Sequence, residues 1–275
     1  MNTFMNKSFY IIIFFIFLIN TEKNIYAKDM TGDNQENDTV FINIQPRTPF
    51  FIYKKNDSKP SDGVAYHLLK KILNSANVKY EFNNIPLVRT LVLMKENKTK
   101  VCYPNALMIK SRLSYVFYSK PYFKDKRTSI LLRKDDNRFT EYKTFSEILK
   151  NKNLRILLKI GYAYGNYIEE TLNKTKKYIT GSVKSDKPDE IILSSNDNYE
   201  MLNEIIEKNG DYMLISRYEA EYLFKENPKY KNSLTIKDVD DLNYNEKRYL
   251  MCSKIVGQET INKINHQIKK IANFD

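Results

Sequence analysis

The feature that most constrains the fold is an alternation of strand-like and helix-like segments that begins near residue 39. Residues 39–53 predict a strand that runs into an aromatic loop. Apolar residues then recur at helical spacing, at Ala65, Leu68, Leu69, Ile72, Leu73 and Ala76. A strand at 79–83, a helix at 87–96 and a strand at 100–104 follow. This order predicts a mostly parallel sheet covered by helices.

A second unit of the same kind begins near residue 136. Thr144 and Glu147 have the spacing of a capping box, in which both side chains satisfy free backbone amides at a helix start. A helical stripe at 201–206 is followed by Gly210, which we expect in the left-handed conformation past the helix end.

The last predicted strand, at 247–253, and the helix after it return to the pattern of the first unit. We therefore predict that one lobe comprises residues 28–135 plus 235–275. The other lobe, residues 136–234, is inserted into it.

Residues 1–27 predict a cleavable export signal. Lys7 precedes an apolar run at 9–19, and Ala27 supplies a small residue at the expected cleavage site. Apolar runs of roughly 7–15 residues are typical of export signals, whereas a spanning helix needs about 20. An uncleaved membrane anchor is the alternative. The pattern predicts a periplasmic or secreted protein.

The net charge of +12 comes from 45 basic and 33 acidic residues. The basic residues are interspersed with acidic ones, which indicates a solvated surface rather than a nucleic-acid-binding face. The spacing of the histidines and cysteines gives no metal or redox site, and we expect no cofactor. In an exported chain, Cys102 and Cys252 predict one disulfide.

Three local patterns point to a binding site. A predicted strand runs into Gly161-Tyr162-Ala163-Tyr164-Gly165 and then a helix, which presents free amides to an anion. Arg112 precedes the segment 116–122, and its guanidinium at this place can bind a carboxylate through two parallel hydrogen bonds. Phe50 and Phe51 lie in the first aromatic loop and can wall a ligand. The alternatives are a structural turn, a surface arginine and core packing.

In this order the patterns resemble the family 3 extracellular solute-binding proteins, which are type 2 periplasmic binding proteins that serve polar amino-acid transporters. The resemblance covers nearly the whole mature chain. It rests on PFF at 49–51, Gly63, Pro86, Arg89, Arg112 with FYSKPY at 117–122, LKNKNLRILLKIGYAYG at 149–165 and NGDYMLIS at 209–216. It implies a two-lobed α/β fold. Each lobe is a mixed, mostly parallel sheet flanked by helices, and hinge strands join the lobes around a ligand cleft.

The resemblance also implies site residues. Arg112 is expected to hold a carboxylate, Phe50 or Phe51 to stack on the ligand, and the loop Gly161–Gly165 to donate backbone hydrogen bonds. The expected ligand-binding set is Arg112, Phe50, Phe51, Arg89, Asn105, Gly161, Tyr162, Tyr164, Gly165 and Ser216. The fold also places the strand of Cys252 beside the strand of Cys102, which makes a disulfide geometrically reasonable.

Two departures from the family pattern bear on the ligand. Leu107 and Ile109 stand where the family often has threonines. Ser216 stands where it often has an aspartate for the ligand's ammonium group. Without that countercharge, Arg89 and Arg112 favour an acidic or otherwise anionic ligand if both face the cleft.

Three functions are compatible with the sequence. The first is a monomeric binding protein that delivers a small amino-acid-like or carboxylate ligand to the permease of an ABC transporter. The second is a dehydratase-like enzyme on the same scaffold, for which Glu219 is the acid to check. The third is a binding module for sensing without transport. The first is the reading that we adopt, with no catalysis and no nucleic-acid partner.

Overall fold

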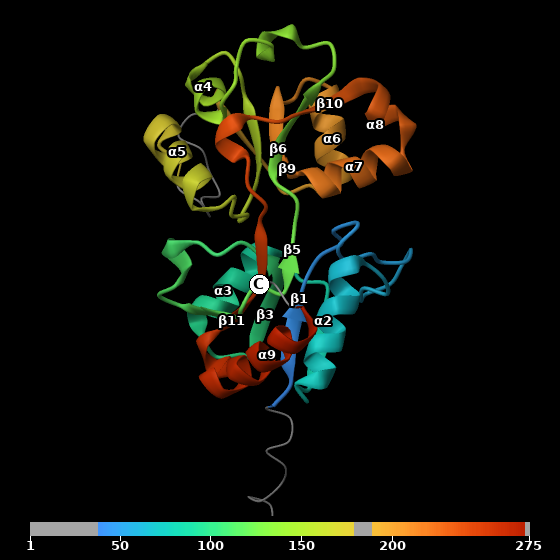
Figure 1. The fold of residues 1–275 in the computed structure, drawn as a ribbon, viewed down its shortest axis with the longest axis vertical. Helices are drawn as coiled ribbons and strands as arrows, with labels where there is room; N and C mark the ends of the chain where they lie inside the picture. Colours follow the sequence, from blue (N-terminus) through green and yellow to red (C-terminus); the bar gives the residue numbers. More distant parts are fainter. Residues whose placement is uncertain (1–37, 179–188, 273–275) are drawn as a thin grey trace, which may run out of the picture. The chain divides into compact units, whose positions relative to one another are not determined.

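The computed structural model describes residues 38–178 and 189–272, so the predicted export signal at 1–27 lies outside the described residues. Residues Thr39–Asp275 form one compact unit. Its strands form two sheets, each flanked by helices (Figure 1). The predicted two-lobed α/β architecture is therefore confirmed. We call the part around the first sheet lobe 1 and the part around the second sheet lobe 2.

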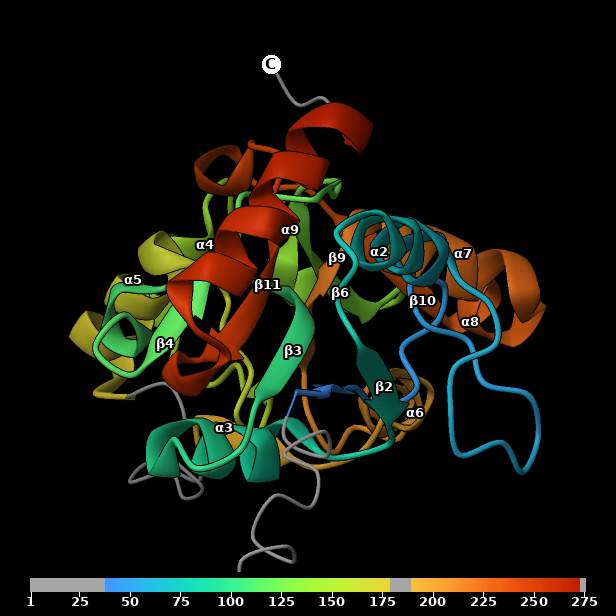
Figure 2. The same cartoon turned by 90° about the horizontal axis from the view of Figure 1, so that it is seen from below.

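Lobe 1 is built on a mixed sheet with the strand order β2-β1-β3-β11-β4, and β5 also pairs with β11. The strands are β1 (Val40–Asn43), β2 (Tyr80–Asn83), β3 (Val101–Ala106), β4 (Val116–Tyr118), β5 (Phe123–Lys124) and β11 (Lys247–Ser253). Strand β1 is parallel to β2 and β3, and β11 is antiparallel to β3. Helices α2 (Val64–Ser75) and α9 (Gln258–Ile271) lie on one face and α3 (Leu87–Glu96) on the other (Figure 2). Short 3-10 helices η3 (Lys110–Arg112) and η6 (Lys254–Val256) complete the lobe.

Lobe 2 has the strand order β10-β6-β9-β7-β8. The strands are β6 (Thr128–Arg133), β7 (Ile156–Lys159), β8 (Ile191–Ser194), β9 (Tyr212–Ser216) and β10 (Leu234–Lys237). The helices are α4 (Phe145–Lys150), α5 (Asn166–Lys176), α6 (Asn198–Ile206), α7 (Arg217–Glu226) and α8 (Pro228–Ser233), with 3-10 turns η4 (Asn137–Phe139) and η5 (Asp240–Leu242). The predicted capping box of Thr144 and Glu147 opens α4. Among the described residues, no helix has the length and apolarity needed to cross a membrane.

Strand periodicity explains why helices cover both faces of the second sheet. In β6, Ile130 and Leu132 belong to the core shared with α4 and α5, and Leu131 belongs to the core shared with α6 and α7. Successive side chains of a strand point to opposite faces, so the three consecutive apolar residues 130–132 of β6 place apolar side chains on both faces of the sheet.

The strand pairing differs from the predicted lobe boundaries at 135/136 and 234/235. Strand β6 was expected in lobe 1 and β10 at the start of its second part, but both pair within the second sheet. Both faces of β6 are apolar, so its sequence pattern does not reveal which sheet it joins. The chain leaves the first sheet after β5 and returns at β11. The division into residues 28–135 plus 235–275 and 136–234 otherwise stays a prediction.

The predicted disulfide between Cys102 and Cys252 is confirmed. The two cysteines are directly opposite each other in the antiparallel pair of β3 and β11. Both are fully buried. The bond therefore joins the two parts of lobe 1 that precede and follow the insertion.

The expectation for Gly210 was wrong. Helix α6 ends at Ile206, and Lys208 adopts the left-handed conformation with φ 65°. A Cβ at Gly210 would lie 3.1 Å from the Cβ of Leu157. The residue is therefore small because β7 packs against it, a constraint that the sequence around the helix end does not show.

Candidate functional site

A cavity of about 50 Å³ lies between the two lobes. Its lobe 1 residues follow β1, lie in or just after β3, begin α3, end η3 or lie near the start of β11. Its lobe 2 residues begin β6, end or follow β7, or lie in β9, α6 and α7. The lining is Arg47, Leu87, Tyr103, Asn105, Ala106, Leu107, Arg112, Thr128, Lys159, Tyr162, Ala163, Tyr164, Asn198, Met201, Met213, Leu214, Ile215, Ser216, Glu219 and Arg248. Carboxyl ends of parallel strands are the usual place for ligand sites in open α/β sheets.

Arg112 lines this cavity, as expected, and only 4% of it is exposed. It ends η3, which follows β3 in lobe 1. Its Nη2 donates a 2.7 Å hydrogen bond to the carbonyl oxygen of Gly161 in lobe 2. Among the described residues, Arg112 forms no ion pair with a carboxylate. The side chain thus joins the lobes, and its charge acts on the buried Glu169 carboxyl at longer range without forming an ion pair with any carboxylate of the described residues.

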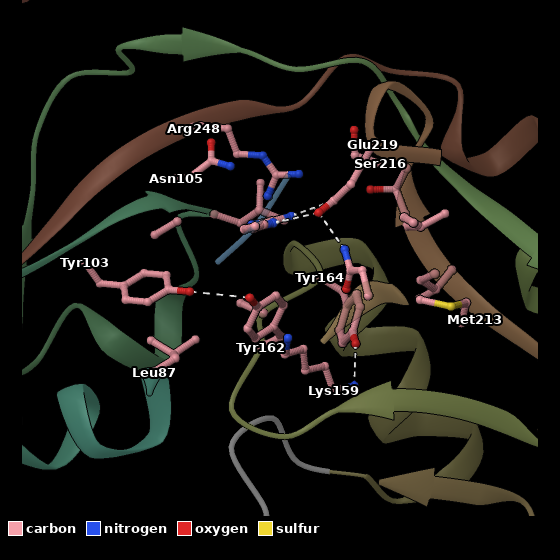
Figure 3. Close-up of a pocket in the computed structure, with 18 of the residues that line it drawn as sticks. Leu87, Tyr103, Asn105, Lys159, Tyr162, Tyr164, Met213, Ser216, Glu219 and Arg248 are labelled. Atoms are coloured by element: carbon pink, nitrogen blue, oxygen red, sulfur yellow. Dashed lines mark hydrogen bonds and ion pairs between the residues drawn. The ribbon is translucent and has the colours of Figure 1, made fainter. Parts of the chain in front are cut away.

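The loop Gly161–Gly165 connects β7 to α5 in the predicted way. Gly161 has φ 79° and Gly165, which caps α5, has φ 92°, a region that favours glycine. A Cβ at Gly161 would also lie 2.9 Å from the Val88 side chain of lobe 1. Tyr162 and Tyr164 line the cavity (Figure 3). The two glycines shape the loop, and the tyrosines supply its contact surface.

Asn105 also lines the cavity, at the end of β3. It is 1% exposed and has a positive φ of 56°. Its backbone N–H donates to the hydroxyl of Tyr122 at 3.0 Å. Within the described part of the chain, neither Nδ2 nor Oδ1 of its side chain has a hydrogen-bond partner. Buried polar atoms nearly always have one, so this amide is available to a bound solute.

Lys159 is a second buried cation, which the sequence did not single out. It ends β7, is 8% exposed and places its Nζ 4.9 Å from the ring centre of Tyr162. The Tyr162 hydroxyl faces that of Tyr103 across the cavity at 3.4 Å (Figure 3). Burial would raise the pKa of Tyr162, but the charges of Lys159 and Arg47 outweigh it and lower that pKa. Burial raises the pKa of Tyr103. This corner of the cavity is therefore electropositive.

Arg47 and Glu219 form a buried ion pair across the lobes. Arg47 Nε and Nη2 each lie 3.1 Å from one oxygen of the Glu219 carboxylate. Asn198 donates to the same carboxylate at 2.5 Å. Burial alone would lower the pKa of Arg47, but Glu219 more than compensates and the pKa is raised. Arg47 lies in the loop after β1, where the sequence pattern points to the phenylalanines and not to this arginine.

Ser216 lines the cavity as expected, but its hydroxyl is engaged. It donates a 2.6 Å hydrogen bond to Asp125 Oδ1. Asp125 Oδ2 accepts two further bonds from Arg248, at 2.9 Å from Nε and 2.6 Å from Nη2. These residues lie where the chain passes between the two sheets. Ser216, which stands where the family often has an aspartate, is therefore hydrogen-bonded to the segments that connect the lobes.

Five expected residues lie outside the cavity lining, namely Gly161 and Gly165, whose loop neighbours do line it, and Phe50, Phe51 and Arg89. Phe50 and Phe51 are fully buried in the core of lobe 1, and neither belongs to the lining. The Phe50 ring packs on Phe123 and Tyr218, and it lies 5.2 Å from the guanidinium of Arg47. Arg89 is exposed on α3. Its helix turns it away from Leu87, which does line the cavity, because residues two apart on a helix face different directions.

Glu169 makes the stability of lobe 2 depend on pH. Burial raises the pKa of its carboxyl to about 7, although the backbone N–H of Tyr164 and the charge of Arg112 act in the opposite direction. The pKa in the unfolded chain is about 4.3. The folded protein therefore holds this proton more tightly than the unfolded chain does. Stability consequently falls as the pH rises from about 4.3 to 7.

We expect this group to lower the free energy of unfolding by about 2–3 kcal/mol across that pH range. Glu169→Gln keeps an oxygen that can accept the Tyr164 N–H, which lies 2.8 Å from Oε1. Urea denaturation of both proteins at several pH values from 4.5 to 8 measures the effect. The variant should gain stability relative to the wild type as the pH rises. Parallel pH profiles would contradict the assignment.

Comparisons with known proteins agree with this architecture. The profile of the bacterial extracellular solute-binding proteins, family 3, matches residues 40–273. Among solved structures, the arginine-, lysine-, histidine-binding protein ArtJ from Geobacillus stearothermophilus is 18% identical, with TM-score 0.64 over 86% of this chain and 90% of that chain. The amino acid ABC transporter substrate-binding protein AbpA from Streptococcus pneumoniae, bound to L-arginine, is 17% identical, with TM-score 0.62 over 86% and 90%.

A third structure, the ancestral amino acid-binding protein AncCDT-1, is described as a precursor of cyclohexadienyl dehydratase. It is 18% identical, with TM-score 0.60 over 86% of this chain and 90% of that chain. No curated protein matches the chain. At these identities the solved structures show the fold alone, while the family profile spans both lobes and confirms the resemblance seen in the sequence. The chain belongs to the bacterial extracellular solute-binding proteins, family 3.

Proposed function

We propose that this protein captures a small carboxylate-bearing anion between its lobes and passes it to an ABC-type importer. The observation that carries the proposal is the charge balance of the cavity. Among the described residues, four cationic side chains line it: Arg47, Arg112, Lys159 and Arg248. Arg47 pairs with Glu219 and Arg248 with Asp125, but neither Arg112 nor Lys159 forms an ion pair with a carboxylate in the described part of the chain. An anionic solute balances these two charges.

The two unbalanced cations come from different lobes. Arg112 belongs to lobe 1 and Lys159 to lobe 2, so an anion that contacts both holds the lobes together. A buried charge without a partner costs several kcal/mol, and a bound carboxylate removes that cost. The unpartnered amide of Asn105 adds a donor and an acceptor for further polar groups of the solute.

Among the described residues, Glu219 is the acidic side chain that lines the cavity, and it is already engaged, which disfavours cationic solutes. Both carboxylate oxygens of Glu219 accept hydrogen bonds from Arg47, and one of them also accepts from Asn198. Both oxygens of Asp125 accept hydrogen bonds from Ser216 and Arg248. A ligand ammonium or guanidinium thus meets no free carboxylate of these two residues. We infer that dicarboxylates and acidic amino acids bind better than arginine or lysine.

The remaining elements of the proposal follow the family. The protein is exported by the segment 1–27, acts as a monomer outside the cytoplasm, and closes its lobes on the ligand before docking on a permease. We propose binding without catalysis. A dehydratase needs a positioned acid or base, and Glu219, the acid expected for that role, is held in an ion pair. Prephenate is therefore expected to remain unchanged in the presence of the protein.

Calorimetric and thermal titrations test the proposal. The mature protein is unfolded in urea with its disulfide intact and refolded, so that solutes from the expression host are removed. Succinate, glutarate, L-glutamate, L-aspartate and citrate are then compared with L-arginine, L-lysine and putrescine. A ligand at 100 times its Kd adds about 2.7 kcal/mol, which raises Tm by roughly 5–10 °C. We expect such shifts only among the anions. Binding of the cations alone, or of no compound, would refute the proposal.

A further inference from the structure

Arg47 lies in surroundings built for a guanidinium group. The Glu219 carboxylate faces it edge-on with two parallel contacts of 3.1 Å, the fork geometry that guanidinium and carboxylate prefer. The ring centres of Phe50 and Tyr162 lie 5.2 and 5.4 Å from its central carbon, within the range of cation–π attraction. The Arg47 side chain is 9% exposed and that of Glu219 is 1% exposed. The contacts are thus removed from bulk water.

These surroundings come from both lobes and do not depend on Arg47 alone. Glu219 stands in the first turn of α7 and is also held by Asn198 at the start of α6. Tyr162 belongs to the loop after β7, and its hydroxyl also meets Tyr103. The Phe50 ring is fixed by Phe123 and Tyr218. A carboxylate and two rings that keep other partners stay in place when the arginine is removed.

We propose that Arg47 occupies a guanidinium subsite of the cleft as a built-in ligand and thereby determines its specificity. While Arg47 is present, the subsite rejects solutes with a cationic side chain, because Glu219 is neutralised and the space beside the Phe50 and Tyr162 rings is filled. The cavity then binds only anionic solutes, which Arg112 and Lys159 attract. The specificity half of this inference rests on the proposed function, whereas the existence of the subsite does not.

Arg47→Ala should therefore produce a protein that binds free guanidinium. The probe is guanidinium chloride at 1–20 mM, compared with sodium and ammonium chloride at the same ionic strength, and the readout is Tm. We expect a saturable rise of several degrees for the variant with guanidinium alone and none for the wild type. The double variant Arg47→Ala, Glu219→Gln lacks the carboxylate and should not respond.

Arg217→Ala is the matched control. Arg217 pairs with Glu221 on the same helix, at 2.8 Å, but about a third of each side chain is exposed. Guanidinium should not raise the Tm of this variant, because an exposed pair offers no enclosed subsite. If Arg47→Ala does not fold by itself, the same salts are added during refolding. Recovery with guanidinium only would support the subsite.

The subsite is overturned if guanidinium gives Arg47→Ala neither a saturable rise in Tm nor recovery on refolding, or if it acts equally on Arg217→Ala. The specificity role is tested with L-arginine, whose affinity should be at least tenfold higher in Arg47→Ala than in the wild type. A variant that responds to guanidinium but still rejects L-arginine would overturn that role. If guanidinium stabilises Arg47→Ala but the wild type binds no anion, the proposed function is refuted and the guanidinium subsite is still supported.

Discussion

Replacing Arg112 with alanine is expected to weaken binding of the preferred carboxylate at least 100-fold. Removing one partner of a buried, hydrogen-bonded charge pair typically costs about 3–5 kcal/mol, and each 1.4 kcal/mol is a factor of ten in Kd. Arg112 is 4% exposed and forms no ion pair with a carboxylate among the described residues. In the variant, the bound carboxylate of the ligand therefore loses its cationic partner. Isothermal titration calorimetry with the tightest-binding carboxylate of the panel measures the loss.

Arg89→Ala is the control for this prediction. Arg89 is a second arginine of lobe 1, but it is exposed and lies outside the cavity. Its removal lowers the net charge by the same amount and should leave Kd unchanged within twofold. Arg112→Lys should bind with intermediate affinity, because the charge remains but the two-pronged geometry is lost. If Arg112→Ala and Arg89→Ala lose the same affinity for the carboxylate, only the net positive charge of the protein attracts the anion.

Removing the disulfide is expected to destabilise the protein by about 3–5 kcal/mol. The bond joins residues separated by 150 positions, so it greatly restricts the unfolded chain. Because the two cysteines are direct neighbours across β3 and β11, the double variant Cys102→Ala, Cys252→Ala retains the strand pairing. Urea denaturation should show the loss, and Tm should fall by roughly 10 °C or more.

The affinity for the ligand should survive this change, since neither cysteine lines the cavity. Reduction of the wild type under denaturing conditions, followed by refolding in reducing buffer, should give the same stability as the double variant. If the double variant and the wild type unfold at the same urea concentration, the bond does not constrain the chain in solution.

Local periodicity predicted the secondary structure well where one pattern dominates. The helix expected at 87–96 and the strand expected at 247–253 have those bounds in the structure. The capping box at Thr144 and the strand before Gly161 were also recognisable, because their signals lie within a few neighbouring residues. The sequence could not assign β6 to a sheet, since pairing depends on partners far along the chain.

The candidate site was predictable only where a short pattern marked it. Arg112, Asn105 and the tyrosines of the loop Gly161–Gly165 do line the cavity. Arg47 and Glu219 lie 172 positions apart, and the sequence around neither residue predicts their pairing. Phe50 was misplaced for a related reason, because an aromatic residue after a strand suits a core as well as a ligand wall. The ligand contacts expected of these residues stay predictions.

A carboxylate that bridges Arg112 and Lys159 is the central feature of the proposed binding mode. A crystal structure of the mature protein with the tightest-binding carboxylate of the panel tests that claim directly. We expect a carboxylate oxygen within hydrogen-bond distance, about 2.7–3.0 Å, of the Arg112 guanidinium and another polar contact with Lys159 Nζ. The Arg47–Glu219 pair should remain closed beside it. A ligand bound with its anionic group away from both cations, or outside the cleft, would contradict the account.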